Sequence, residues 1–125
     1  MNIEIAKSLL SFIAPTEVIE NFEFVSIKEN PDHLILEFEE FDHLIPEKLK
    51  GRETKSNGFM NKLELHTFPQ KGKSCYLHIK RRRWEDKSTG DNYSNHYDLY
   101  KEGMKSTHEL GEFLKKNNRG QADKF

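Results

Sequence analysis

The first twenty residues show the apolar spacing of two short helices. Apolar residues recur at helical intervals from Ile3 to Ile13, which predicts a helix over this segment. Pro15 ends it, because proline lacks a backbone donor and restricts the residue before it. Thr16 is suited to cap a second helix over Glu17–Asn21, whose early acid favours the helix dipole. The chain is therefore expected to begin with two helices.

Alternation of apolar and polar residues then replaces the helical spacing. It predicts strands over 22–28 and 33–41, on either side of a turn at Asn30-Pro31-Asp32. The second strand alternates apolar residues with acids, so one of its faces is expected to be buried: Leu34, Leu36 and Phe38. The polar segment 46–58 predicts a flexible loop or a hinge, and residues 59–68 predict a third strand.

A further pair of extended segments predicts a hairpin. Its first strand begins with Cys75–Ile79 and ends in the run Lys80–Trp84. A turn is expected at Lys87–Asn92, and the second strand covers Tyr93–Tyr100. Both faces of the first strand change from apolar to basic along its length. The pattern therefore predicts a hairpin with its base in the core and a projecting basic tip.

The last part of the chain predicts one more helix. Ser106 and Glu109 have the spacing of a capping box, and the helix that they open has an apolar stripe of Leu110, Phe113 and Leu114. The expected fold class is α+β, with N-terminal helices, about five mostly antiparallel strands and a C-terminal helix. We expect one domain over 1–117, with a possible hinge at 46–58 and a disordered tail over 118–125.

Composition narrows this picture. Apolar residues make up 34% of the 125-residue chain and charged residues 33%, so the core must be small. The net charge is −1, but residues 1–62 hold seven Lys/Arg against twelve Asp/Glu, and residues 63–125 hold thirteen against nine. This asymmetry predicts a basic working surface in the second half, or an acidic surface that docks another molecule. The N-terminus has no signal-peptide pattern and no apolar run is long enough to span a bilayer, so the expected location is the cytoplasm.

The basic run is the best candidate for a functional site. Four consecutive cations beside a tryptophan are typical of a surface that contacts nucleic acid. Arginine binds phosphate or guanine in a bidentate manner, and Trp84 can stack, wedge, or instead pack the hairpin. The predicted DNA-binding residues are Lys80, Arg81, Arg82, Arg83 and Trp84, with Lys71, Lys73 and Lys87 as auxiliary cations. The alternative is a solvated, aggregation-resistant strand edge, which the neighbouring Glu85 and Asp86 favour.

Other chemistry is weakly signalled. The single cysteine, Cys75, excludes an internal disulfide and a cysteine-based zinc cluster, and its place in an apolar strand predicts a buried residue rather than a nucleophile. No two histidines have the spacing of metal ligands, although His78 and His96 could face each other across the hairpin. We therefore expect no metal, no cofactor and no catalytic residue.

The segment 68–84 resembles a known family. It contains Pro69, Gly72-Lys73, Leu77 and Ile79, followed by Lys80–Trp84, and it is similar to the N-terminal region of Aon-type insertion-sequence transposases, which are distantly like the ISL-three group. The segment Thr107-His-Glu-Leu-Gly-Glu-Phe-Leu114 resembles the helix start of that region. The resemblance covers roughly residues 8–117.

The resemblance implies a DNA-binding module for transposon ends. The zinc-containing relatives carry cysteines where this chain has Lys87-Ser-Thr-Gly-Asp-Asn92, so the resemblance does not imply zinc here. The catalytic acids of the transposase are expected on another polypeptide, which is also a possible partner. Three alternatives stay open: a protein–protein accessory or regulatory subunit of a transposase, an enzyme that uses Cys75 or scattered acids, and a decayed fragment with no present activity.

Overall fold

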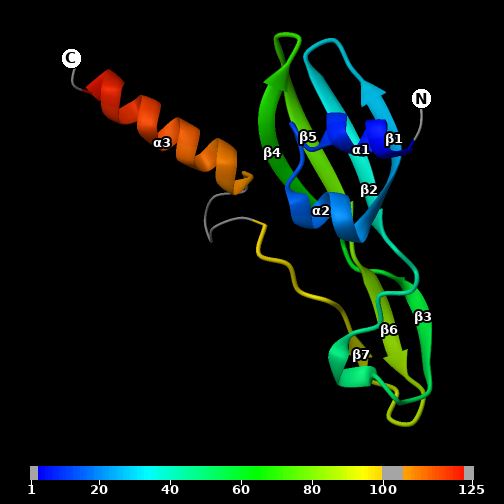
Figure 1. Cartoon of the computed structure of the whole chain (residues 1–125). Coiled ribbons are helices and arrows are strands. Elements are labelled where there is room, and N and C mark those ends of the chain that lie inside the picture. Colours follow the sequence, from blue (N-terminus) through cyan, green and yellow to red (C-terminus); the bar gives the residue numbers. More distant parts are fainter. Residues whose placement is uncertain (1–2, 100–105, 123–125) are drawn as a thin grey trace.

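The computed structural model describes residues 3–99 and 106–122 and confirms the α+β class. Seven strands form a four-stranded and a three-stranded sheet, and three α-helices accompany them. Figure 1 shows an elongated molecule, with the four-stranded sheet and two helices at one end and the three-stranded sheet at the other. The expected number of strands, about five, was too low.

The two N-terminal helices pack on one face of the larger sheet. Helix α1 covers Ile3–Leu10 and helix α2 covers Thr16–Asn21. The predicted cap was wrong: Thr16 lies inside α2, and Pro15 occupies the N-cap position without a side-chain hydrogen bond. Proline suits this boundary because its φ of −58° and ψ of 149° lead an extended chain into the first helical turn. Val18 of α2 is fully buried against the sheet.

The four-stranded sheet has the order β1-β2-β5-β4. Its strands are β1 (Phe22–Glu29), β2 (His33–Glu40), β4 (Leu63–Gln70) and β5 (Lys73–Lys80). Strands β1 and β2, and likewise β4 and β5, form antiparallel hairpins, whereas β2 and β5 pair in parallel. The β4–β5 turn has positive φ at Lys71 (53°) and Gly72 (74°), the pattern that suits the right-handed twist of a two-residue hairpin.

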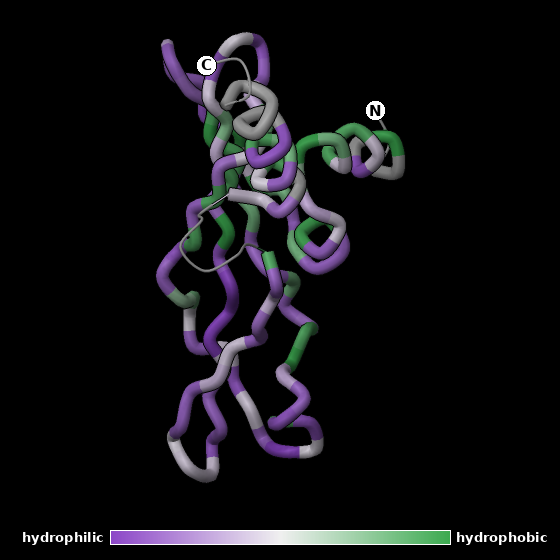
Figure 2. The backbone as a smooth tube through the Cα atoms, turned by 90° about the vertical axis from the view of Figure 1, so that its left-hand side faces the viewer, coloured by the Kyte–Doolittle hydropathy of each residue, from purple (hydrophilic) through white to green (hydrophobic). Residues whose placement is uncertain are grey.

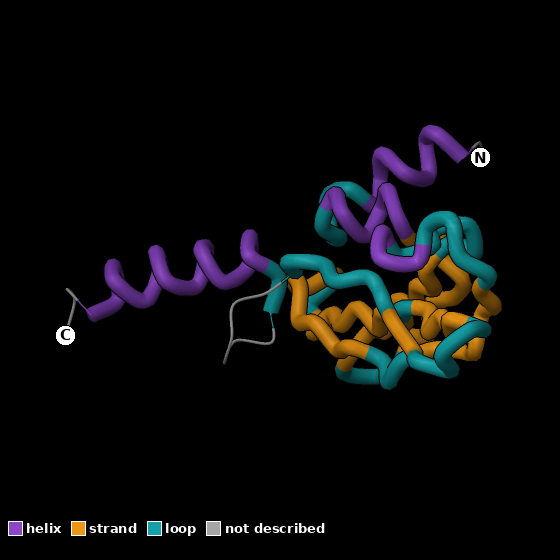
Figure 3. The backbone as a smooth tube through the Cα atoms, turned by 90° about the horizontal axis from the view of Figure 1, so that it is seen from below, coloured by secondary structure: helices purple, strands orange, loops and turns teal. Residues whose placement is uncertain are grey.

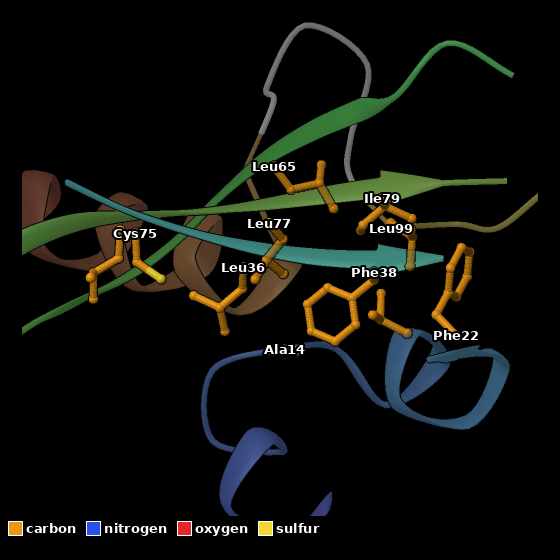
Figure 4. Packing of buried hydrophobic residues seen from close by; sticks show 11 residues of the cluster. Ala14, Phe22, Leu36, Phe38, Leu65, Cys75, Leu77, Ile79 and Leu99 are labelled. Atoms are coloured by element: carbon orange, nitrogen blue, oxygen red, sulfur yellow. The ribbon is translucent and has the colours of Figure 1, made fainter. Parts of the chain in front are cut away.

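The main core lies between this sheet and the two helices. The predicted inward residues of β2 are confirmed, since Leu34, Leu36 and Phe38 are all buried. The cluster in Figure 4 adds residues of β4, β5, the start of β1 and the later chain: Phe22, Leu65, Cys75, Leu77, Ile79 and Leu99. The thiol of Cys75 is completely buried, and burial raises its pKa. Cys75 is therefore a core residue, as expected.

The second sheet lies beyond the end of the first and has the order β3-β6-β7. It consists of β3 (Thr54–Phe59), β6 (Arg82–Asp86) and β7 (Asn92–Tyr93), and a 3-10 helix at Glu47–Leu49 precedes it. The segment 46–58, predicted to be a loop or hinge, thus contains a 3-10 turn and most of a strand. Leu49 and Trp84 are buried here and lie outside the main cluster.

The predicted hairpin is present but differs in its proportions. Strands β6 and β7 pair antiparallel, with Trp84 opposite Tyr93. The second strand is only two residues long, and residues 94–99 are not in a strand. Tyr100, the end of the predicted strand, lies outside the described residues. Within this segment, the Asn95 side chain donates to the Leu44 carbonyl at 2.7 Å.

Helix α3 (His108–Ala122) projects from the body beside β4 (Figures 1 and 3). Its cap is Thr107 rather than Ser106: the Thr107 hydroxyl accepts the Leu110 N–H at 3.2 Å, and Ser106 instead forms a bridge with His66 of β4. The side chain of Glu109, the other half of the predicted capping box, lies outside the described part. The helix includes residues 118–122 of the expected tail, and residues 123–125 are not described.

Candidate nucleic-acid interface

The run Lys80–Trp84 lies where the chain passes from one sheet to the other, not at the tip of a hairpin. Lys80 is the last residue of β5, and Arg82 is the first of β6. Arg81 links the two strands, and its carbonyl accepts the Met60 N–H at 2.8 Å. The turn of the hairpin is formed by residues 87–91, within the predicted turn at Lys87–Asn92. The cations therefore lie along the first strand of the hairpin, as predicted, but this strand is interrupted at Arg81 and they lie nearer to the larger sheet than to the tip.

Backbone carbonyls hold all three guanidinium groups in place. Nη1 of Arg81 donates to the Asn95 carbonyl at 3.1 Å, Nε of Arg82 to the Glu40 carbonyl at 2.8 Å, and Nε of Arg83 to the Asn57 carbonyl at 2.9 Å. A guanidinium has five N–H donors, and each of these bonds uses one of them. Because a carbonyl is neutral, these bonds fix the side chains without compensating their charge. The three arginines are thus positioned cations.

An aromatic ring supports two of the cations. The Arg82 guanidinium carbon lies 4.9 Å from the centroid of the Phe59 ring, and Lys80 Nζ lies 6.0 Å from it. Both distances are within the range of cation–π attraction. Arg83 extends over Gly58, whose positive φ of 72° a side chain would strain. Strand β3 therefore forms the surface on which the basic run rests.

A buried carboxylate ties the basic run to the larger sheet. Glu40 is completely buried and follows Leu36 and Phe38 on the inward face of β2. Its Oε1 accepts the backbone N–H of Arg82 at 2.8 Å, and its Oε2 accepts Asn95 Nδ2 at 3.0 Å and the Tyr97 hydroxyl. Burial, and then the bond to Glu40, raise the pKa of Tyr97.

Sequence reasoning missed this network, although one signal could have shown part of it. Glu40 continues the even-numbered positions that bury Leu34, Leu36 and Phe38, so period-two spacing alone places it inward. A carboxylate at such a position needs donors. Nothing local identifies those donors, since Asn95 and Tyr97 lie 55 and 57 residues away.

Trp84 is packed inside the smaller sheet. Its side chain is 5% exposed, opposite Ser56 on one side and Tyr93 on the other. Its indole N–H is buried and has no hydrogen-bond partner within the described residues. Of the two roles weighed for Trp84, the packing role matches this position. Stacking on a base would require the ring to leave its site.

The auxiliary lysines are not brought together. Lys71 and Lys73 lie at the β4–β5 turn, and Lys73 forms an ion pair with Glu29 at 2.9 Å. Seven residues of extended chain separate Lys73 from Lys80, which is about 23 Å at the rise of a strand. Lys87 is exposed beside the hairpin tip, and its backbone N–H binds the Glu53 carbonyl. Of the three auxiliary lysines, only Lys87 therefore lies beside the smaller sheet with the arginines.

Charge also separates between the two sheets. Segments 46–62 and 81–93, which build the smaller sheet, hold nine Lys/Arg and five Asp/Glu. Segments 22–40 and 63–80, which build the larger sheet, hold four against seven. We call the first set the basic lobe; its backbone is mostly hydrophilic in Figure 2. Lysines of the connector that sequence reasoning left out belong to it: Lys48, Lys50, Lys55 and Lys62.

One acid of the basic lobe, Asp86, stabilises the turn at the tip of the β6–β7 hairpin. Asp86 is buried and accepts the Ser88 hydroxyl at 2.7 Å, the Ser88 N–H at 2.9 Å and Arg52 Nη1 at 2.9 Å. These bonds lower the pKa of Asp86 to about 2, with the Ser88 hydroxyl as the largest cause and Arg52 next. Asp86 therefore stays charged and fixes the turn, while its charge is matched by that of Arg52.

The other chemistry considered in the sequence has no assembled site in the described residues. The Nε2 atom of His78 contacts Glu64 at 2.7 Å, so its partner is that carboxylate and not His96. No group of three or more metal-ligating side chains is found in 3–99 and 106–122. Nor does this part of the chain include a helix long and apolar enough to cross a membrane. Compared with known proteins, the chain matches no protein-family model, no curated protein and no solved structure.

Proposed function

We propose that this chain is the DNA-binding module of a transposase and binds double-stranded DNA through the basic lobe. The observation that carries the proposal is the set of three guanidinium groups fixed by neutral carbonyls, in a lobe that holds nine Lys/Arg against five Asp/Glu. Cations whose direct hydrogen bonds go to neutral carbonyls are suited to phosphates, because little side-chain freedom is lost on binding. The acidic character of the larger sheet orients DNA toward the lobe.

The transposase context rests on the resemblance of the segment 68–84 and of Thr107–Leu114 to Aon-type transposases. It specifies the ligand as the terminal inverted repeats of an insertion element, bound in the cytoplasm. It also makes the catalytic transposase polypeptide a possible partner. The proposal assigns no reaction, metal or cofactor to this chain.

Within this proposal, the contact residues follow from their place in or next to the basic lobe. Arg81, Arg82 and Arg83, with Lys80 and Lys87, are the proposed contacts. Trp84 supports them from the core of the lobe. Lys71 and Lys73, at the far end of β5, are omitted from the contact surface. Unpaired lysines of the connector join it, because within the described residues neither Lys48 nor Lys62 has an ion-pair partner.

The test is fluorescence anisotropy with two labelled duplexes of equal length, one an insertion-element end and one its scrambled sequence. We expect Arg83→Gln to weaken binding to both and to reduce the slope of log affinity against log salt by about 0.9 if one phosphate contact is lost. Lys73→Gln is the matched control: it removes the same charge, from the acidic sheet, and should leave the slope unchanged. Equal effects of the two variants would contradict the assignment to the basic lobe.

A protein–protein accessory role is the second candidate, and one observation favours it. Helix α1 and the turn after it expose three apolar side chains at helical spacing, namely Ile5, Leu9 and Phe12, the last of which is 79% exposed. This candidate predicts weak binding that is equal for the two duplexes and a stable complex with the catalytic polypeptide. A preference for the element end would favour the first function.

A further inference from the structure

Strand β1 is an uncovered edge of the larger sheet. It pairs only with β2 among the described strands, so its outer side presents free backbone donors and acceptors. The opposite edge, β4, differs because its residue His66 bridges to Ser106 and its residue Phe68 packs against Phe113 of α3 at 5.5 Å between ring centroids. The outer edge of β4 therefore has contacts with the C-terminal segment, whereas the outer edge of β1 has no neighbouring strand among the described residues.

The uncovered edge exposes apolar side chains between the charged residues Glu23 and Lys28. Phe24, Val25 and Ile27 are 39%, 43% and 58% exposed. Phe24 borders a groove of about 420 Å³ that runs between α1, α2 and the first two strands, and its walls include Leu10, Phe38 and Phe41. Monomeric proteins usually protect an edge with charges, prolines or bulges, because apolar edges pair with other chains. The charges of β1 are of both signs and its centre is apolar, so they need not repel a second copy. An uncovered edge with exposed apolar side chains is suited to pair with a strand of another chain.

The sequence of β1 is complementary to itself when two copies run antiparallel. If residues whose numbers sum to 51 face each other, Glu23 lies opposite Lys28 of the second copy, and Phe24 lies opposite Ile27. Each of these pairs occurs twice because the arrangement is two-fold symmetric. Opposite charges and an aromatic beside a branched aliphatic residue are the favourable cross-strand pairs.

The bulge in β1 makes this register geometrically possible. A two-fold axis normal to the sheet keeps each side chain on the same face in both copies, so opposed residues must share a face. In a regular strand, residues five apart such as Glu23 and Lys28 point to opposite faces. The register of β1 on β2 shifts between Phe24 and Ser26, and this extra residue restores the match. Lys28 indeed reaches Glu37 at 3.3 Å, and Glu23 is paired with Glu39, two residues further on the same face of β2.

We propose that the protein forms a homodimer in which β1 pairs antiparallel with β1 of a second copy in this register. The two sheets then form one continuous eight-stranded sheet, and the two basic lobes lie at its opposite ends. A single strand pair with its flanking side chains falls at or below the roughly 1,200 Å² of a standard interface, so the dissociation constant is expected to be micromolar. The inference does not depend on the proposed function.

Charge reversal tests the register directly. Sedimentation is measured without DNA from about 1 to several hundred micromolar protein, a range around a micromolar dissociation constant. Glu23→Lys places a lysine opposite Lys28 of the second copy, and Lys28→Glu places a glutamate opposite Glu23 of the second copy. Each variant alone should dimerise about tenfold or more weakly, because like charges then face each other twice. An equimolar mixture of the two variants removes these like-charge contacts in the mixed dimer and should dimerise like the wild type.

Glu23→Lys keeps folding and association apart, whereas Lys28→Glu also replaces the ion pair with Glu37 by a like-charge contact within the chain. Glu23→Lys also removes a like-charge pair with Glu39 within the chain, so the folded monomer should not be weakened. Glu53→Lys, the same charge change on the exposed surface of the basic lobe, is the matched control and should dimerise like the wild type. A wild-type protein that stays monomeric throughout the range overturns the proposal. So does a dimer that Glu23→Lys leaves intact, or a mixture that stays monomeric.

Discussion

The junction between the two sheets should depend on the negative charge of Glu40. In Glu40→Gln one acceptor oxygen becomes a donor, although three donors converge on the carboxylate: the Arg82 N–H, Asn95 and Tyr97. At least one buried donor then loses its acceptor. Hydrogen bonds to a charged group contribute about 1.5–3 kcal/mol, and an unsatisfied buried donor costs about 1–3 kcal/mol. Removal of a buried charge offsets part of this loss. We expect Glu40→Gln to lower the free energy of unfolding by about 2–4 kcal/mol, a large share of the roughly 5–15 kcal/mol of a typical domain.

Urea unfolding followed by two probes measures this effect. The only tryptophan, Trp84, reports on the smaller sheet, and far-ultraviolet circular dichroism reports on both sheets. Glu39→Gln is the matched control, since it makes the same chemical change on the opposite face of β2 and should shift stability by no more than about 0.5 kcal/mol. If the network couples the sheets, Glu40→Gln should also move the tryptophan transition to lower urea than the dichroism transition. An effect of Glu40→Gln no larger than that of Glu39→Gln would refute the reasoning.

Three further predictions follow from the buried groups. The folded pKa of Asp86, about 2, is below its ordinary value of 3.8, so the stability that it contributes is present above about pH 4 and is lost as pH falls through about 2. The free energies of unfolding of the wild type and Asp86→Asn, measured in urea, should therefore converge over this interval. A constant difference between them would contradict the assignment. Cys75 should not react with a thiol reagent in the native protein and should react fully in denaturant, and rapid native labelling would show that its strand is open. Leu77→Ala should lower the free energy of unfolding by about 2–5 kcal/mol, because the side chain is fully buried. Leu9→Ala, at a position 54% exposed, should lower it by about 0.5 kcal/mol or less. Similar losses for the two variants would refute the core described here.

The larger sheet could be predicted because its strands carry a burial signal. Period-two alternation in β2 reflects a sheet with one face on the helices, and the spacing of Leu34, Leu36 and Phe38 follows directly from it. The smaller sheet gives no such signal. Its strand β3 reads Thr-Lys-Ser-Asn-Gly-Phe, which is polar over its first five residues, and it forms because the distant strand β6 offers a pairing edge.

The candidate site was predicted in its composition but not in its geometry. A run of cations is visible in the sequence, and so is the burial tendency of Trp84. The anchors of Arg81 and Arg83 are backbone carbonyls of Asn95 and Asn57, and any residue can supply a carbonyl. Residue types therefore could not show that the cations are fixed, nor that the chain leaves the larger sheet at Arg81. Both facts depend on contacts between distant segments.

The continuous run of chain through both sheets also determines the order in which the protein can fold. The β1–β2 and β4–β5 hairpins join neighbouring segments, whereas the parallel β2–β5 pairing joins residues about 40 apart, such as His33 and Ser74. Closing so long a loop costs entropy before any contact repays it, so this pairing is expected to limit the folding rate. Strand β6 continues directly from β5, and it meets β3 and the Glu40 carboxylate only once β5 lies beside β2. The basic lobe should therefore be the last region to acquire its native structure, and the proposed DNA binding should recover later in refolding than the hairpins of the larger sheet.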